Sequence, residues 1–476
     1  MCDTWVALKD ATSECRVIFA KNSDRPIFDC QPLVLRPRQY LPAGSSIQTG
    51  YIELPQSEVT YAHLGSSPYW CWGYEEGINE WGVAIGNEAI YTKPLREAVT
   101  DFQQGKQVEP GLLGMDLIRI VLERCQTSKQ AVELIGGLIE EYGQFGSGNP
   151  GKTHVQGSYD NAFIIADPAE AWVLEAAGKR WAARRFSEGL TSISNEPGIR
   201  TQWSLGSPDL EGYARQKGWW TEPLRGHPAL TFDFAQAYVD EKTARQVSHM
   251  RVMRSRQLLE ERRGQITPQW MMHIARDHYE DTFLQGPYFD AADPDFLSLC
   301  MHVSPADFTW GNTASSCVAV LPKEAGGLPV FWWTPGPPCN GCYVPFFPHG
   351  SRLPEMVSRA GKLGKAVIPA DQVGEDSFSP ESYWWLFREL NDRVKGGRVN
   401  SLPGCYAERN PQVRERFYRL EKTFAAQLPS VVRQAGELQE KDPARMAKVL
   451  DDFSAACVAQ VLAELRGLLD WLPAIE

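Results

Sequence analysis

The chain has 476 residues, of which 43% are hydrophobic and 22% are charged, as is ordinary for a globular protein. Its formal net charge of −11 argues against binding to nucleic acid or an anionic membrane surface, because both favour basic proteins. No apolar run is long enough for a transmembrane helix, and the N-terminus lacks the basic and apolar regions of a signal peptide. Eleven scattered cysteines without a disulfide-like framework predict a cytoplasmic protein with reduced thiols.

The first 26 residues predict a β-hairpin with a cysteine at its start. Residues 4–8 and 16–20 are short apolar runs of β-forming residues, and the segment between them is polar and turn-like. Pairing of the two strands would bring Cys2, at the head of the first, beside residues 21–25 at the end of the second. The hairpin therefore predicts a thiol close to a carboxylate, an amide and two cations.

Removal of Met1, which a small second residue such as cysteine permits, would give Cys2 a free α-amine as well as a thiol. An α-amine has a pKa of about 7.7–8.0, so it can accept the thiol proton near neutral pH without a histidine. Such N-terminal nucleophiles are known in acyl transfer. In the predicted hairpin, the Asp24 carboxylate can hold the amine, and a cation such as Lys21 can lower the pKa of the thiol.

Long motifs follow one another through the first part of the chain: CDTWVA and VIFAKNSDRP near the start, WCWGYEEGINEWGVAIGNEA at 70–89, GLLGMDL at 111–117 and AWVLE at 171–175. They resemble the secernin and dipeptidase-A family of N-terminal nucleophile (Ntn) hydrolases, most closely its secernin branch, over residues 2–350. The resemblance implies an α+β fold, the αββα sandwich of two mainly antiparallel sheets covered by helices. It also implies a cysteine hydrolase of the dipeptidase type that acts through an acyl-enzyme on Cys2.

A strand is expected over residues 82–89, and Asn87 lies near its end. Amide side chains are good donors to an oxyanion, and the resemblance implies that Asn87 contacts the substrate. The alternative is an ordinary amide that caps a turn. Residues 111–142 follow as two helices with a break near 127–130, and they are suited to cover one face of a sheet.

Residues 146–153, GSGNPGKT, match the phosphate-binding pattern GxxxxGK[ST]. That loop requires a strand before it and a helix after it, so that helix N–H groups face the phosphates. Here a predicted helix precedes the pattern and a predicted strand follows it. We therefore interpret the stretch as a variable connecting loop and not as a nucleotide site.

Residues 161–195 predict an antiparallel meander of four strands, at 162–166, 171–176, 180–186 and 189–195. Asn195 ends the last of them. The resemblance implies that this residue supplies the oxyanion hole, and the alternative is an ordinary Asn-Glu-Pro turn.

Residues 200–270 are expected to be helical and polar, with several arginines on neighbouring helical faces. The resemblance implies that one of them reaches the nucleophile, with Arg251 as the first candidate and Arg254 as the second. The alternative is a solvated basic face. His249, His273 and His278 lack the spacing of metal ligands and are expected to be ordinary surface or core residues.

Two more strands are expected at 313–321 and 329–334. Cys339 and Cys342 form a single CxxC in a proline-rich loop, without a second pair or a histidine at ligand spacing, so neither a metal site nor a cofactor is expected. His302 follows Cys300, but the surroundings of a papain-type nucleophile are absent, so it is not expected to act as a base.

From residue 378 onward helix formers dominate, which predicts a mostly helical C-terminal extension over 351–476 beyond the core at 2–350. This extension either wraps around the core or forms the interface of a homo-oligomer. The sequence does not decide between the two.

The resulting hypothesis is that the Cys2 thiolate attacks the carbonyl of a small peptide or amide while its own amine carries the proton. Asn195 and Asn87 hold the oxyanion and Asp24 orients the amine. Lys21 stands where several relatives carry arginine, which weakens any bidentate role at that position.

Two alternatives stay open. The first is an amidase or acyltransferase for a non-peptide acyl substrate, with Trp70, Trp72, Trp332 and Trp333 lining the pocket. The second is a non-enzymatic, secernin-like regulatory protein that keeps the fold.

Overall fold

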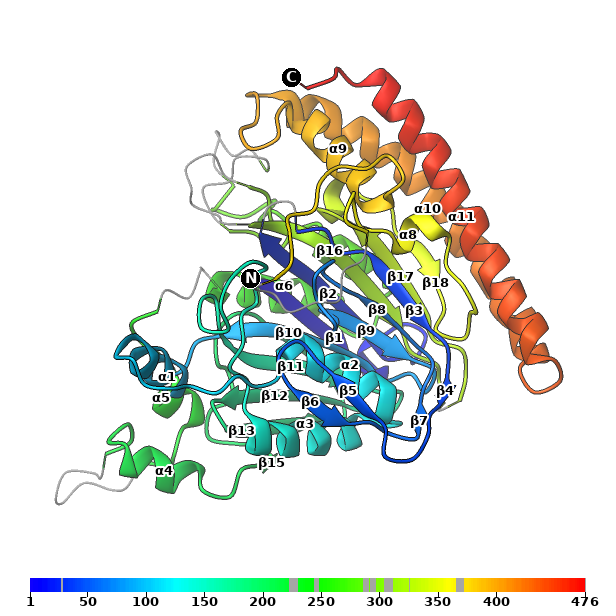
Figure 1. Cartoon of the computed structure of the whole chain (residues 1–476). Helices are drawn as coiled ribbons and strands as arrows, with labels where there is room; N and C mark the ends of the chain where they lie inside the picture. Colours follow the sequence, from blue (N-terminus) through cyan, green and yellow to red (C-terminus); the bar gives the residue numbers. More distant parts are fainter. Residues whose placement is uncertain are drawn as a thin grey trace.

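The fold is built on two large antiparallel sheets (Figure 1). The computed structural model describes residues 1–475 except 27–28, 222–229, 244–247, 286–290, 292–296, 304–310, 325 and 365–371. The first sheet has six strands in the order β14 (Leu190–Ile193), β1 (Cys2–Ala7), β2 (Ile18–Pro26), β16 (Gly311–Val320), β17 (Val330–Pro335) and β18 (Val344–Phe346). The second has eight, in the order β15 (Leu205–Gly206), β13 (Arg180–Phe186), β12 (Ala171–Ala177), β11 (Asp160–Ala166), β10 (Ala84–Ile90), β9 (Glu76–Asn79), β8 (His63–Ser66) and β3 (Leu33–Arg36).

The two sheets pack face to face, and strand alternation decides which side chains lie between them. In β1, Thr4 donates a hydrogen bond across the interface to Glu88 of β10, whereas its neighbour Asp3 points the other way and binds Arg251. Because successive side chains in a strand alternate between faces, Cys2 shares the inner face with Thr4. The predicted hairpin is confirmed, with Cys2 opposite Ser23 in the register of β1 and β2.

Helices cover both outer faces of the sandwich. On the eight-stranded sheet, α2 (Gly114–Arg124) packs on β9 and β10, and α3 (Ser128–Tyr142) packs on β12 and β13. On the six-stranded sheet, α6 (Ser248–Glu261) packs on β14 and β1, and α7 (Pro268–Ala275) packs on β2 and β16. The αββα layers expected from the sequence are therefore confirmed.

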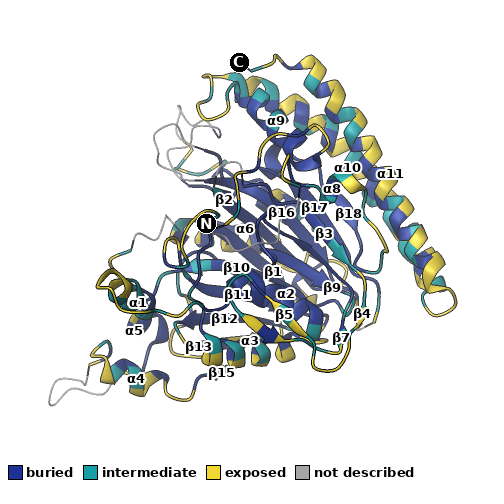
Figure 2. Cartoon of the chain, in the orientation of Figure 1, coloured by how far each residue is buried: buried dark blue, intermediate teal, exposed yellow. Residues whose placement is uncertain are grey.

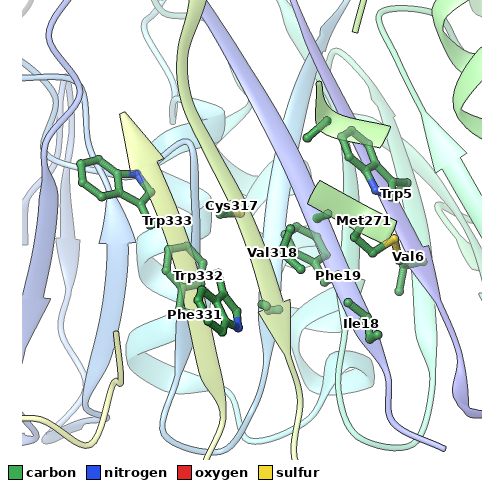
Figure 3. Close-up of a cluster of buried hydrophobic side chains, with 14 of the residues drawn as sticks. Trp5, Val6, Ile18, Phe19, Met271, Cys317, Val318, Phe331, Trp332 and Trp333 are labelled. Atoms are coloured by element: carbon green, nitrogen blue, oxygen red, sulfur yellow. The ribbon is translucent and has the colours of Figure 1, made fainter. Parts of the chain in front are cut away.

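Buried apolar side chains hold the six-stranded sheet to its helices. Figure 3 shows Trp5, Ile18, Val318 and Trp332 on four neighbouring strands, with Met271 of α7 among them. All five are at most 2% exposed. Burying each large apolar side chain of this kind stabilises the fold by about 1.5–3 kcal/mol. This stabilisation can offset the cost of burying the polar groups at one end of the strands.

The C-terminal helices pack against the six-stranded sheet. α9 (Tyr383–Lys395) contacts β17, and α11 (Pro443–Trp471) contacts β18. α10 (Cys405–Leu438) pairs with α11 along its length, and Figure 2 shows that the outward faces of both are exposed. The helical character predicted for this part of the chain is confirmed, and the buried residues of these helices belong to the same hydrophobic cluster as the sheet.

One prediction about the meander is wrong. β11, β12 and β13 pair in order as expected, but β14 pairs with β1 in the other sheet and not with β13. β14 leaves the meander and joins the other sheet beside β1, which would otherwise be an edge strand. This pairing places Asn195, just after β14, at the N-terminus of the chain. The site is therefore built from segments that are distant in the sequence.

The remaining elements are short. Two small sheets pair β4 (Gln39–Tyr40) with β7 (Val59–Thr60) and β5 (Ser46–Gln48) with β6 (Glu53–Pro55). The described part of 200–270 is less helical than expected, since α4 (Leu210–Gln216) and α5 (Phe234–Tyr238) are brief. The other short elements are α1 (Lys93–Gln103), α8 (Glu355–Ser358), η1 (Lys9–Ala11) and η2 (Pro338–Asn340). None of the helices in the described part of the chain combines the length and hydropathy needed to cross a lipid bilayer.

Candidate active site

Cys2 opens into a small cavity at the end of the two sheets. The cavity has a volume of about 250 Å³. Its walls come from the N-terminus, from β2 and β10 and from the loop between α3 and β11, and the described residues that line it are Met1, Cys2, Asp24, Arg25, Glu75, Asn87, Ala89, Tyr91, Gly148, Asn149, Gly157 and Tyr159. Three of the residues selected from the sequence, Cys2, Asp24 and Asn87, therefore share one cavity.

Met1 forms part of the wall in front of the thiol. Its amine donates to the carbonyl oxygen of Asp24 (3.1 Å), and the Asp24 N–H donates to the Met1 carbonyl (2.9 Å). With Met1 in place, Cys2 is only 6% exposed. Burial raises the pKa of the Cys2 thiol to about 11, and the positive charges of Lys21 and the Met1 amine offset only part of this rise. In this form the thiol is protonated at neutral pH.

Asn195 holds the backbone nitrogen of Cys2. Its Oδ1 accepts from Cys2 N (3.1 Å) and from the Arg251 guanidinium (2.7 Å), while its Nδ2 donates to the Ala89 carbonyl (2.8 Å). These three partners fix which end of the amide is oxygen, because two are donors and one is an acceptor. The nitrogen that would become the α-amine therefore already has a hydrogen-bond acceptor.

Arg251 is the arginine that reaches the N-terminus. It is fully buried, and its Nη1 donates to the Asp3 carboxylate (2.5 Å) and to the Cys2 carbonyl (3.3 Å). Arg254, the second candidate, binds the Asp277 carboxylate (2.6 Å) instead. One helical turn thus separates an arginine at Cys2 from one that binds the segment after α7, and the solvated-face alternative does not apply to Arg251.

The Asp24 carboxylate lies in the same buried network. Its Oδ1 accepts from the Thr313 hydroxyl (2.7 Å). Its Oδ2 lies 3.9 Å from the Arg251 guanidinium and has no hydrogen-bond partner among the described residues. Burial raises the pKa of Asp24 to about 7, with the Met1 amine and Arg251 opposing the rise and Asp3 adding to it. An unpaired buried carboxylate oxygen beside the N-terminus is suited to bind an ammonium group.

Lys21 is buried behind the cavity wall and contacts two of the residues that line it, Glu75 and Asn87. The Lys21 ammonium donates to the Glu75 carbonyl (2.6 Å) and to Asn87 Oδ1 (3.2 Å). Burial by itself lowers the pKa of Lys21, but the neighbouring thiol and glutamates raise it by more, so the lysine stays charged. Asn87 Nδ2 donates to Asn161 Oδ1 (2.8 Å), which uses one of its two amide hydrogens. A fixed positive charge and an amide donor therefore lie below the thiol.

The predicted hairpin placed Arg25 among the cations near Cys2, but Arg25 was not selected as a site residue. Arg25 lines the cavity and bridges Asp29 (2.7 Å) and Glu75 (2.9 Å), and it also donates to the Gly148 carbonyl. That glycine belongs to the loop that was set aside as a false phosphate-binding motif. The loop does lie between α3 and β11, as expected, but it forms one wall of the cavity. The signal was that Arg25 lies four residues after Lys21 in the same strand, which places both side chains on one face.

The four tryptophans proposed to line an acyl pocket lie elsewhere, so this expectation is wrong for the cavity at Cys2. Trp70 binds Asp29, Trp72 stacks on Arg119, and Trp332 and Trp333 are buried in the six-stranded sheet. No tryptophan is among the described residues that line the cavity.

The expectation that no histidine lies at ligand spacing from the CxxC holds only along the sequence. In space, His278, Cys300, His302 and Cys339 lie together and are all buried. Cys342, the other cysteine of the pair, faces the Phe417 carbonyl instead. His278 is buried, as expected of a core residue, but it belongs to this cluster, and His302 contacts cysteines other than Cys2.

Comparisons with known proteins agree with the resemblance read from the motifs. The profile described as "Peptidase family C69" matches residues 1–265. A "Dipeptidase" of Bifidobacterium longum (strain NCC 2705) is 27% identical over 217 residues, 42% of this chain and 38% of that protein. A "Probable dipeptidase A" of Streptococcus pyogenes serotype M3 (strain SSI-1) is 25% identical over 208 residues, 42% and 40% of the two chains. The matches thus span about two fifths of each relative's length.

The solved structures that match this chain are less similar to it in sequence than these dipeptidases. A mutant conjugated bile acid hydrolase from Clostridium perfringens has 14% identity and a TM-score of 0.35, covering 70% of this chain and 88% of that one. A Caenorhabditis elegans orthologue of N-acylethanolamine-hydrolyzing acid amidase has 14% identity and a TM-score of 0.31, covering 67% and 92%. The fold assignment rests on the sheets and helices themselves.

Proposed function

The chain belongs to peptidase family C69, and from this premise we propose that it is a cysteine hydrolase that cleaves the amide bond of dipeptides or other short peptides in the cytoplasm. The observation that carries the proposal is the convergence on the Cys2 nitrogen. Asn195 accepts from this nitrogen, Arg251 fixes Asn195, and the unpaired oxygen of Asp24 lies in the same network. These groups can hold and orient an α-amine, which Cys2 carries once Met1 is removed.

Loss of Met1 is the activating step in this proposal. It would remove one wall of the cavity and turn the Cys2 amide nitrogen into a base with a pKa of about 7.7–8.0. The amine would take the thiol proton, and the thiolate would attack the substrate carbonyl beside the charged Lys21. The amine would then return the proton to the leaving amine, and water would release the acyl group from Cys2.

The polarity of the cavity favours a small peptide over a fatty acyl substrate. Glu75, Asp24 and Arg25 supply both signs of charge to its lining. A dipeptide carries an ammonium and a carboxylate, so it matches this lining better than an alkyl chain does.

The test combines N-terminal mapping with a substrate panel. Intact mass and peptide mapping should show that Met1 is absent, and the purified chain should hydrolyse dipeptides faster than N-acyl amides. Cys2→Ala should abolish hydrolysis, whereas Cys71→Ala, which removes another buried cysteine outside the cavity lining, should retain it. Retention of Met1 on folded protein would contradict the proposal, and activity that survives Cys2→Ala would do the same. Absence of any turnover by trimmed protein would favour the regulatory alternative.

A further inference from the structure

Four buried side chains that the proposed hydrolysis does not use lie together at one end of the six-stranded sheet. Each of His278, Cys300, His302 and Cys339 offers one nitrogen or sulfur atom, and these four atoms all lie within 4.8 Å of one another. Two thiols and two imidazoles so close together, out of contact with water, are costly unless they bind something or one another.

Three of the distances among these atoms fit a tetrahedron around one metal ion, and the others are at most 4.8 Å. Zinc binds histidine nitrogen at about 2.0–2.1 Å and cysteine sulfur at about 2.3 Å, so ligand atoms on a tetrahedron lie about 3.3–3.8 Å apart. The two Nε2 atoms of His278 and His302 are 3.3 Å apart. His302 Nε2 lies 3.7 Å from the Cys300 sulfur and 3.3 Å from that of Cys339.

The surroundings of His278 also fit a metal ligand. Its Nδ1 lies 3.0 Å from the Glu280 carboxylate, which leaves Nε2 to face the cluster. A carboxylate on the far nitrogen of a histidine is the usual partner of a zinc ligand, because it fixes the tautomer and the ring orientation. The Tyr406 ring of α10 packs edge-on against both imidazoles, with centroid distances of 6.3 and 5.6 Å.

From this geometry we propose that His278, Cys300, His302 and Cys339 bind one structural Zn²⁺ ion. Two sulfur and two nitrogen ligands in a tetrahedral arrangement select zinc among the common divalent metals. All four ligands come from the protein, so no position is open for water or substrate, and the site is structural rather than catalytic.

The ion would join three segments that are separate in the sequence. His278 follows α7, Cys300 and His302 belong to the stretch that precedes β16, and Cys339 lies in η2 after β17. The residue between the two central ligands, Met301, is bound through its backbone to Thr313, whose hydroxyl donates to Asp24. The ion would thus fix the stretch that packs beside Met1 at the N-terminus.

The test is the metal content of the full-length chain, purified without chelators. Elemental analysis should give one Zn²⁺ per chain, and Cys339→Ser should lose it. Cys342→Ser is the matched control, since it changes the other cysteine of the same CxxC, buried but facing Phe417, and should keep the zinc. A Cys2→Ala chain should keep it too, so this result does not depend on whether the protein is a hydrolase.

A second measurement covers the case in which the ligand variant fails to fold. Wild-type chain stripped of metal and titrated with Co²⁺ should develop the thiolate charge-transfer and intense ligand-field bands of a tetrahedral sulfur-nitrogen site. Zn²⁺ should then abolish these bands. Wild-type protein with no bound zinc and no cobalt spectrum would overturn the proposal. A mapped Cys300–Cys339 disulfide, or zinc that persists in Cys339→Ser, would overturn it as well.

Discussion

The backbone nitrogen of Cys2 lies 3.1 Å from Oδ1 of Asn195, although the two residues are 193 positions apart in the chain. This contact exists because β14 crosses from the meander to pair with β1, which places the end of β14 beside the start of the chain. The same amide uses its nitrogen to bind the Ala89 carbonyl, so it has one further amide hydrogen to offer. We therefore propose that Asn195 acts on both the amine and the oxyanion.

Asn195→Asp separates these two roles. Aspartate keeps an acceptor for the Cys2 amine and for Arg251, but it has neither the amide hydrogen that binds the Ala89 carbonyl nor the one for the oxyanion. Loss of one oxyanion donor lowers kcat by about 10²–10³. We expect a fall of this size with little change in KM, measured by steady-state hydrolysis of the best dipeptide. Glu196→Gln, at the next residue, should behave like the wild type. A fall of less than tenfold in folded Asn195→Asp would exclude the oxyanion role.

The two arginines of α6 provide a matched pair of variants. Arg251→Lys keeps the charge but cannot bind Asp3 and Asn195 at once with a planar fork, so the Cys2 nitrogen loses its fixed acceptor. We expect kcat/KM to fall at least tenfold. Arg254→Lys disturbs a pair with Asp277 away from Cys2 and should lower the melting temperature with nearly normal kcat/KM. Equal activity losses in both variants would show that the effect is general destabilisation.

Met1 retention should be visible in the pH dependence of thiol alkylation. Inserting a bulky residue between Met1 and Cys2 blocks the removal of Met1. Burial holds the pKa of the Cys2 thiol near 11 when a residue precedes it, so the rate of alkylation should rise about tenfold per pH unit up to pH 9. In the chain without Met1, the Cys2 thiol should be alkylated faster, and the alkylation rate should reach its plateau at a lower pH. Both measurements use a Cys15→Ser background, because Cys15 is exposed and would react first. Identical profiles would contradict activation by Met1 removal.

The sequence predicted the parts of the site that depend on local patterns. The hairpin that brings Cys2 opposite Ser23 follows from two short β-prone runs. The role of Cys2 as nucleophile stays a prediction, made from the family resemblance together with its place at the start of the first run. The choice of Arg251 over Arg254 came from the family resemblance, since either arginine fits a polar helix. The structure distinguishes the two arginines, because Arg251 binds Cys2 and Asp3 in β1 whereas Arg254 binds Asp277.

The parts that the sequence could not predict depend on contacts between distant segments. Nothing in residues 189–195 shows that β14 leaves the meander for the other sheet, because a strand that is buried on both faces has the same pattern in either place. The cluster of His278 and His302 with Cys339 could not be predicted from the sequence for a related reason. Spacing rules recognise ligands that are neighbours along the chain, and these lie on three segments that only the folded sheet brings together.

Buried acids should make the protein less stable as the pH rises, and Glu88 is the clearest case. It accepts a hydrogen bond from Thr4 between the two sheets, and burial raises its pKa to about 8, opposed in part by Lys21. An unfolded glutamate has a pKa of about 4.3. Between these two values the unfolded chain releases the proton while the folded chain keeps it, so the free energy of unfolding decreases with increasing pH.

Glu88→Gln removes this titration and keeps an oxygen that can accept from Thr4. Relative to the wild type, the variant should gain stability as the pH rises from 5 to 8, by up to about 4 kcal/mol, since one pKa unit corresponds to 1.36 kcal/mol. Urea unfolding at intervals of one pH unit measures this difference. Glu109→Gln, at an exposed position, should show a difference that does not change with pH. A Glu88→Gln difference that is equally constant would mean that Glu88 is already ionised in the folded chain at pH 5, held by Lys21.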